Sequence, residues 1–138
     1  MEKKINVAFI CTHNSCRSQM AEALAMEMGL EGVAFHSAGS MPADRVDPGA
    51  VRALMRLRGV DMSSLRPKAT SAIPHPDYAI SMGCGVACPW AGRPFDEDWG
   101  LEDPTGKGDE AYERAIGEIS RRLDGLALRL RRRQLLGL

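Results

Sequence analysis

A cysteine and an arginine stand at a spacing that can bind an oxyanion in the stretch CTHNSCRS, residues 11–18. Cys11 follows an apolar run and a helical pattern begins at Ser18, so the stretch is predicted to link a strand to a helix N-terminus. The backbone N–H groups of such a turn point into one concavity, and together with the helix dipole they attract an anion. Arg17, six positions after Cys11, can fold its guanidinium over this concavity and bind two oxygens of a tetrahedral oxyanion.

The same turn predicts an activated nucleophile. Positive surroundings favour the thiolate form of Cys11 near neutral pH. The hydroxyl of Ser18 can donate a hydrogen bond to this sulfur, and Asn14 suits a left-handed backbone and can hold the turn together through its amide. We therefore expect a thiolate to attack a bound oxyanion. The predicted oxyanion-binding loop also includes Thr12, His13, Ser15, Cys16 and Arg17.

Further residues that could do chemistry lie in one long segment. Cys84 and Cys88 follow a third apolar run, and the segment from Cys84 to Gly108 is rich in glycine, proline and acidic residues. Cysteines in a glycine-rich segment just past a strand are poorly placed for burial in a core, which favours a chemical role. Asp103 precedes a proline, and the residues alone leave it open between a proton donor and a turn residue.

The elements that must position these residues alternate along the chain. Apolar runs without polar alternation predict buried parallel strands at residues 5–10, 33–39 and 77–83. Helical patterns run from Ser18 to a stop at Gly29, from a cap at Asp47 to Gly59, and from Asp109 into a basic tail. This alternation predicts an α/β fold with an open parallel sheet, whose ligands bind at the carboxyl ends of the strands. The predicted inward-facing residues are Met20, Ala21, Leu24, Ala25 and Met28, then Val51, Leu54 and Met55, then Tyr112, Ala115, Ile116, Ile119 and Leu123.

The composition excludes several classes of protein. With 138 residues and 44% hydrophobic side chains, residues 1–138 suit a single domain with its own core. The formal net charge is zero, so overall charge indicates neither a nucleic-acid partner nor an anionic membrane. No run approaches membrane-spanning length and no signal-peptide cleavage site is recognisable, so we expect a cytoplasmic protein. Four cysteines without a sign of export indicate reactive or metal-binding thiols rather than structural disulfides.

The stretch CTHNSCRSQMAE resembles the phosphate-binding loop of the low-molecular-weight protein tyrosine phosphatase superfamily, and in particular of the thioredoxin-coupled arsenate reductases built on that fold. The resemblance extends over nearly the whole chain, through HSAG at residues 36–39, SMGCGVACP at 81–89 and DWGLEDPTG at 98–106. It implies an open parallel four-stranded sheet flanked by helices. We expect no cofactor and assign no metal-ligating residue to the site.

The resemblance also implies a role for each matching residue. Cys11 corresponds to the nucleophile, Arg17 to the oxyanion-binding arginine, and Asp103 to the general acid. Cys84 would attack the sulfur of a Cys11–arsenic adduct and release arsenite, and Cys88 would then take over the disulfide. The implied partners are arsenate, with phosphate or sulfate as competing oxyanions, and thioredoxin as electron donor.

The sequence departs from the family pattern near the loop. His13 stands where a glycine is common. Some family members hold a potassium ion with an Asn, a Glu, a Ser and an Asp. Asn14, Glu22 and Ser37 match the first three, but Lys68 stands at the aspartate position. Either a potassium ion binds near Asn14, or the ammonium of Lys68 replaces it.

Other functions stay open at this point. Phosphatases of the superfamily follow Asp-Pro with tyrosines, whereas Thr105 and Gly106 follow here, which argues against an aromatic phosphoester as substrate. A phosphatase acting on phosphoesters is nevertheless the alternative to arsenate reduction. A binding protein for Zn²⁺ or arsenite would need three or four converging thiolates, and Cys16 is interpreted as a loop residue rather than a relay thiol. The short spacing of Cys84 and Cys88 leaves the order of the relay open.

Overall fold

Four parallel strands form one open sheet in the computed structural model, which describes residues 4–83 and 94–137. The strand order is β2-β1-β3-β4, so the first strand is central and is paired on both sides. Because all strands are parallel, their carboxyl ends meet at one edge of the sheet. The strands are β1 (Ile5–Cys11), β2 (Val33–Gly39), β3 (Tyr78–Ser81) and β4 (Glu97–Asp98).

The predicted strands are found with small changes at their ends. β2 has the predicted bounds, β1 extends one residue further to Cys11, and β3 is shorter than predicted. β4 lies in the segment for which no regular element was predicted. Its two residues are too few to show a period, and only their pairing with β3 defines them as a strand.

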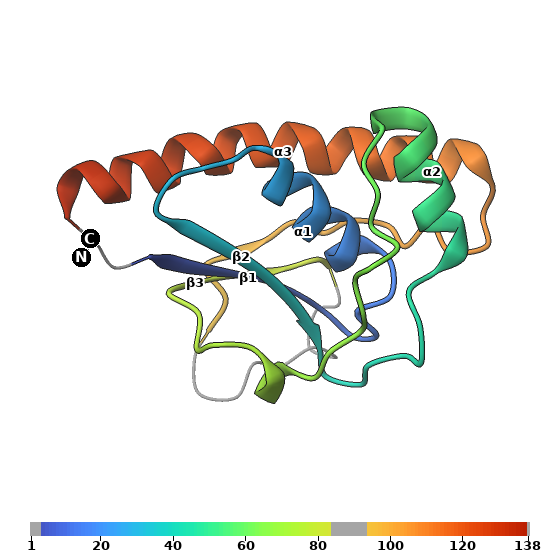
Figure 1. Cartoon of the computed structure of the whole chain (residues 1–138), viewed down its shortest axis with the longest axis horizontal. Helices are drawn as coiled ribbons and strands as arrows, with labels where there is room; N and C mark the ends of the chain where they lie inside the picture. Colours follow the sequence, from blue (N-terminus) through green and yellow to red (C-terminus); the bar gives the residue numbers. More distant parts are fainter. Residues whose placement is uncertain (1–3, 84–93, 138) are drawn as a thin grey trace.

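The described residues form three α-helices, which are α1 (Arg17–Glu27), α2 (Pro48–Arg58) and α3 (Asp109–Leu136), and a short 3₁₀ helix, η1, which covers Thr70–Ala72. α3 runs along the length of the molecule, and all three α-helices lie on the same side of the sheet (Figure 1). α1 lies between α3 and the sheet and packs against both. Within the described ranges, no helix is long and apolar enough to span a membrane.

The caps predicted for α2 are present. Asp47 accepts a hydrogen bond from the backbone N–H of Gly49 at 3.0 Å, Pro48 is the first helical residue, and Gly59 closes the helix with φ = 66°. Leu54 is buried as predicted, but the prediction for Met55 is wrong because this side chain is 47% exposed. α2 packs through a narrow stripe that also includes Ala50 and Ala53, and Met55 lies beside this stripe.

α1 is more deeply buried than its sequence pattern predicts. Met20, Ala21, Leu24 and Ala25 are buried as expected, and all five inward residues predicted for α3 are buried too. On α1, however, three polar residues are buried as well, because the helix is covered by the sheet on one side and by α3 on the other. These are Ser18, Gln19 and Glu22.

Part of the segment from Cys84 to Gly108 packs into the core on the helical side of the sheet. Trp99, just after β4, is 2% exposed and its ring lies 5.6 Å from that of Phe9 on β1. A smaller cluster on the other face contains Ala8, Ile10 and Ala38. Trp99 therefore fixes the chain against the sheet four residues before Asp103.

Candidate active site

The loop between β1 and α1 is shaped by backbone hydrogen bonds from a distant segment. Three of its carbonyl oxygens accept hydrogen bonds from the residues after β2, and in a trans peptide the N–H group of the following residue points the opposite way. The N–H groups of His13, Asn14 and Cys16 therefore point into the concavity at the end of β1. The three bonds are Met41 N to Thr12 O at 2.8 Å, Ala43 N to His13 O at 2.9 Å, and Asp47 N to Ser15 O at 2.8 Å.

Sequence reasoning missed the role of residues 41–47. The bonds from this segment are made by backbone atoms, which leave no trace in side-chain type. The signal that could have found the contact is Gly39, the last residue of β2. A Cβ there would lie 2.6 Å from Thr12 O, 2.9 Å from Cys11 O and 3.0 Å from Asn14 N. Only glycine allows β2 to end directly against the loop.

Cys11 is 3% exposed and its sulfur receives contacts from two sides. Ser18 Oγ lies 2.8 Å from Cys11 Sγ, and the backbone N–H of Asn14 donates to the same sulfur at 3.2 Å. Asn14 has φ = 52°, and it is the one non-glycine residue with positive φ in the described part of the chain. The prediction of a left-handed asparagine in this loop is confirmed. The sulfur is therefore held in the loop by a side-chain hydroxyl and by a backbone N–H group.

Arg17 opens α1 and reaches the carboxyl edge of the sheet. Its Nη1 donates to Met82 O at 3.1 Å and to Leu101 O at 2.9 Å. These carbonyls follow β3 and β4, so the guanidinium is held between the two chain segments that flank the undescribed residues. Within the described ranges both bonds use one nitrogen, which leaves the Nε and Nη2 donors for an oxyanion.

Asp103 is exposed and follows Leu101 closely in sequence. Its Oδ1 accepts hydrogen bonds from the backbone N–H of Thr105 at 3.1 Å and from Thr105 Oγ1 at 2.7 Å. Desolvation raises the pKa of Asp103, but the Thr105 hydrogen bonds and the charges of Arg17 and Lys107 outweigh it and hold the pKa below its ordinary value. An oxyanion bound at Arg17 would bring negative charge and favour the protonated carboxyl.

Cys16 differs from Cys11 in its surroundings. It is also 3% exposed, but burial raises the pKa of its thiol, and the nearby Thr105 side chain, which lowers this pKa, does not offset the effect. The charges of Asp47 and Asp103 raise this pKa further. Cys16 is thus held as a neutral thiol, which supports its interpretation as a loop residue.

Asp47 connects the loop to the start of α3. Its backbone N–H bonds to Ser15 O, and its Oδ2 accepts a hydrogen bond from the hydroxyl of Tyr112. A Cβ at Gly49 would collide with this tyrosine hydroxyl. The cap of α2 is therefore also a link between the loop of Cys11 and the helix that follows Asp103.

The positive charge expected beside Glu22 comes from the chain itself. Ser37 Oγ donates to Glu22 Oε1 at 2.5 Å, and Lys68 Nζ lies 3.7 Å from the same oxygen. Lys68 Nζ also donates to Arg66 O at 3.0 Å. These residues fit a built-in ammonium rather than a bound potassium ion. Among the described residues no group of three His, Cys, Asp or Glu side chains could hold a metal ion.

Other predicted residues lie at the rim or outside the described ranges. His13 is exposed and its Nδ1 lies 3.1 Å from Met41 O, a contact at the mouth of the loop. Cys84 and Cys88 fall in residues 84–93, which the structure does not describe. The chain on either side is close together, because Leu101 N donates to Met82 O at 3.2 Å.

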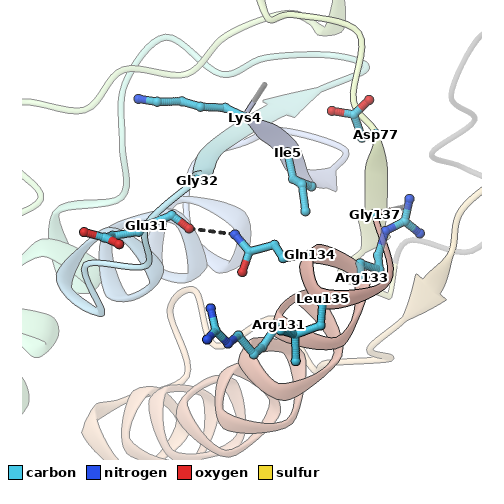
Figure 2. A pocket seen from close by; sticks show the side chains of 10 residues that line it. All are labelled: Lys4, Ile5, Glu31, Gly32, Asp77, Arg131, Arg133, Gln134, Leu135 and Gly137. Atoms are coloured by element: carbon cyan, nitrogen blue, oxygen red, sulfur yellow. Dashed lines mark hydrogen bonds between the residues drawn. The ribbon is translucent and has the colours of Figure 1, made fainter. Parts of the chain in front are cut away.

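A hollow of about 670 Å³ lies at the opposite edge of the sheet, where β1 begins and α3 ends. Figure 2 shows its lining, and the side chains of Lys4, Arg131 and Arg133 point in different directions there. Charges that do not converge form no oxyanion site. The loop of Cys11 and Arg17 is the candidate active site because of the contacts described above.

Comparison with known proteins agrees with this geometry. A family model described as low molecular weight phosphotyrosine protein phosphatase matches residues 6–135. A glutaredoxin arsenate reductase of Synechocystis sp. is 36% identical over 129 residues, which cover 90% of this chain and 97% of that protein. The solved structure of an arsenate reductase in the phosphate binding state has a TM-score of 0.79 and 35% identity, and covers 91% of this chain and 98% of that one.

The name of a second solved structure includes the electron donor of that protein. It is the thioredoxin-dependent arsenate reductase of Corynebacterium glutamicum, with a TM-score of 0.70 and 36% identity over 91% of this chain and 63% of that one. The family match over residues 6–135 spans both the loop of Cys11 and the loop of Asp103. The chain belongs to the low molecular weight phosphotyrosine protein phosphatase family.

Proposed function

We propose that this protein reduces arsenate to arsenite in the cytoplasm and that residues 1–138 act as one catalytic domain. The observation that carries the proposal is the loop at the end of β1, where Cys11 Sγ lies in hydrogen-bond contact with Ser18 and Asn14, and where Arg17 has Nε and Nη2 donors that bond to no residue of the described ranges. Arsenate is a tetrahedral oxyanion and fits this donor set. Relatives that cover most of this chain are arsenate reductases.

The first step is attack by the Cys11 thiolate on arsenic. A sulfur–arsenic bond forms, an arsenic–oxygen bond breaks, and the departing oxygen takes a proton from Asp103 and leaves as water. The inward N–H groups of the loop and the guanidinium of Arg17 hold the remaining oxygens. Two oxygens bound by a planar guanidinium fix the arsenic opposite the sulfur.

The second step is a cysteine relay. The thiolate of Cys84 attacks the sulfur of Cys11, a disulfide forms, and the electron pair of the sulfur–arsenic bond passes to arsenic. Arsenic changes from the +5 to the +3 state and leaves as arsenite. Cys88 then attacks Cys84, which frees Cys11 and leaves a disulfide between 84 and 88. Thioredoxin reduces this disulfide and becomes oxidised in turn. A thioredoxin-dependent relative supports this donor, and another relative's name makes glutaredoxin the alternative.

A coupled assay tests the reaction and the donor. Arsenate-dependent NADPH oxidation is expected with thioredoxin and thioredoxin reductase, and none is expected for Cys11→Ser. Replacing thioredoxin with glutaredoxin, glutathione and glutathione reductase distinguishes the two donors. Hydrolysis of phosphoesters without any thiol reductant, combined with no arsenate reduction, would instead support a phosphatase, which needs Cys11, Arg17 and Asp103 but no relay.

Removing single cysteines tests the relay. Cys88→Ser, given excess arsenate without a reductant, is expected to make about one arsenite per protein and to accumulate a disulfide between 11 and 84. Cys84→Ser should make none by this intramolecular route. Wild-type protein should also stop near one turnover, with the disulfide between 84 and 88, as read by non-reducing peptide mapping. Full multi-turnover activity of Cys84→Ser with thioredoxin alone would contradict the relay.

A further inference from the structure

Gln19 is a fully buried polar residue that the proposed chemistry does not use. It lies in the first turn of α1 with 0% exposure. Its Nε2 faces three oxygens: Asn14 O at 3.0 Å, Asn14 Oδ1 at 3.0 Å and Arg66 O at 2.9 Å. All three are acceptors, so the amide must present its nitrogen to them and not its oxygen.

The other half of this amide is poorly satisfied. Gln19 Oε1 is buried and accepts no hydrogen bond from the described residues. A buried acceptor without a donor destabilises a protein. An apolar side chain of similar length, such as methionine, would avoid this penalty. The retained amide therefore indicates that its donor side contributes something beyond filling space.

The contacts of the Asn14 side chain fix which group donates each hydrogen bond between Asn14, Ser18 and Cys11. The backbone N–H of Lys68 can only donate, and it reaches Asn14 Oδ1 at 2.9 Å. This fixes the oxygen of the Asn14 amide next to Lys68 and Gln19, so its Nδ2 donates to Ser18 Oγ at 2.8 Å. The hydroxyl hydrogen of Ser18 must then point elsewhere, and Cys11 Sγ lies 2.8 Å away. Each step runs from donor to acceptor and ends at the sulfur.

We propose that Gln19 is a positioning residue that orients the Asn14 side chain, so that Asn14 and Ser18 together stabilise the thiolate of Cys11. Gln19 holds Asn14 at its backbone oxygen and at its side-chain oxygen, and thereby supports its left-handed conformation. Its bond to Arg66 O ties the segment before η1 to the loop. The inference rests on the proposed function only in taking Cys11 as the nucleophile.

The test measures the alkylation of Cys11 by iodoacetamide as a function of pH in the full chain, resolved by peptide mass spectrometry. Gln19→Met keeps the length of the side chain and removes both amide hydrogens. The pH midpoint of alkylation is expected to rise by about 0.5 to 1 unit, because one of two donors to Asn14 Oδ1 is lost. The rate at high pH should not change, since a fully formed thiolate no longer depends on the network.

A matched control and a double substitution distinguish a specific effect of Gln19 on Asn14 from a general loss of stability. Gln134 also donates through Nε2, to Glu31 O at 2.7 Å, but at the opposite edge of the sheet (Figure 2). Gln134→Met should leave the midpoint unchanged. In a Ser18→Ala background the path to Cys11 is already cut, so adding Gln19→Met should cause no further rise.

Two results would overturn the inference: a folded Gln19→Met protein with the wild-type midpoint, or an equal rise with and without Ser18. If Gln19→Met does not fold, as judged by thermal melting, Gln19→Glu serves in its place. Its carboxyl keeps the shape and offers at most one hydrogen, when protonated, in place of the two of the amide, and its upward shift must shrink in the Ser18→Ala background. Slow alkylation of Cys11 in the wild type would contradict the proposed nucleophile itself. Fast wild-type alkylation that is insensitive to Gln19 contradicts this inference alone.

Discussion

The loops that carry Cys11 and Asp103 approach the same arginine but are held in different ways. Cys11, Asn14 and Ser18 are buried and bonded to one another, and the loop around them is bonded to residues 41–47. Asp103 is exposed, and its described hydrogen bonds come from Thr105 alone. The fold therefore fixes the position of the proposed nucleophile before a substrate binds, whereas the protonation of the proposed acid responds to nearby charge.

The largest expected effect contrasts the two buried cysteines of the loop. Cys11→Ser should lower arsenate turnover by roughly 10⁴-fold or more, because no other group can form the adduct. Cys16→Ser should retain most of the activity, because burial raises the pKa of the Cys16 thiol and keeps it neutral, whereas Cys11 is the proposed nucleophile. Steady-state turnover of both variants checks the contrast. Equal loss in both would show that burial does not distinguish the two thiols.

The next effect concerns the exposed loop. Asp103→Asn is expected to lower turnover by roughly 10² to 10⁴ through loss of the proton donor. Alkylation of Cys11 and its protection by phosphate or sulfate should persist, because the nucleophile loop is held independently. The control is Glu102→Gln, which removes the adjacent exposed carboxyl that pairs with Lys107 at 3.0 Å, and which should be nearly silent. Wild-type turnover of the Asn variant would return Asp103 to the role of a turn residue.

A third test addresses how the fold supports the nucleophile loop. Gly39→Ala would place a Cβ within 3.0 Å of three backbone atoms of the loop, so we expect destabilisation of about 1 to 3 kcal/mol and weaker protection of Cys11 by oxyanions. Gly117→Ala on α3 meets no atom within 4 Å and should stabilise the protein by about 0.5 to 1 kcal/mol. Denaturant unfolding measures both changes. A neutral Gly39→Ala with normal protection would contradict the close packing of β2 against the loop.

The features of the site that were predictable from the sequence depend on neighbouring residues, and those that were missed depend on distant ones. Cys11, Asn14, Arg17 and the caps of α2 were predictable because their physical requirements involve residues near them in the chain. The donors to Thr12 O, His13 O and Ser15 O were not, because backbone atoms of a distant segment supply them. The burial of Gln19 was missed for a related reason, since its side chain is covered by elements on both faces of α1. Tertiary packing, rather than local pattern, sets these features.

The smallest expected effect concerns Thr105 and the pKa of Asp103, the proposed general acid. The hydrogen bonds of Thr105 lower the pKa of Asp103, so Thr105→Val, which removes the hydroxyl donor, should raise this pKa. A general acid acts in its protonated form, and its contribution is lost as pH rises through its pKa. The alkaline limb of the turnover profile should therefore move to higher pH by less than about one unit.

Thr105→Ser provides the matched comparison, because it keeps the hydroxyl at a similar position. Its pH profile should stay close to that of the wild type, while the alkylation profile of Cys11 should change in neither variant. A shift of the Cys11 profile in Thr105→Val would mean that the two loops are electrostatically coupled more strongly than their separate hydrogen bonds indicate. An unmoved turnover profile in the Val variant would mean that Asp103 does not supply the proton whose loss limits turnover at high pH.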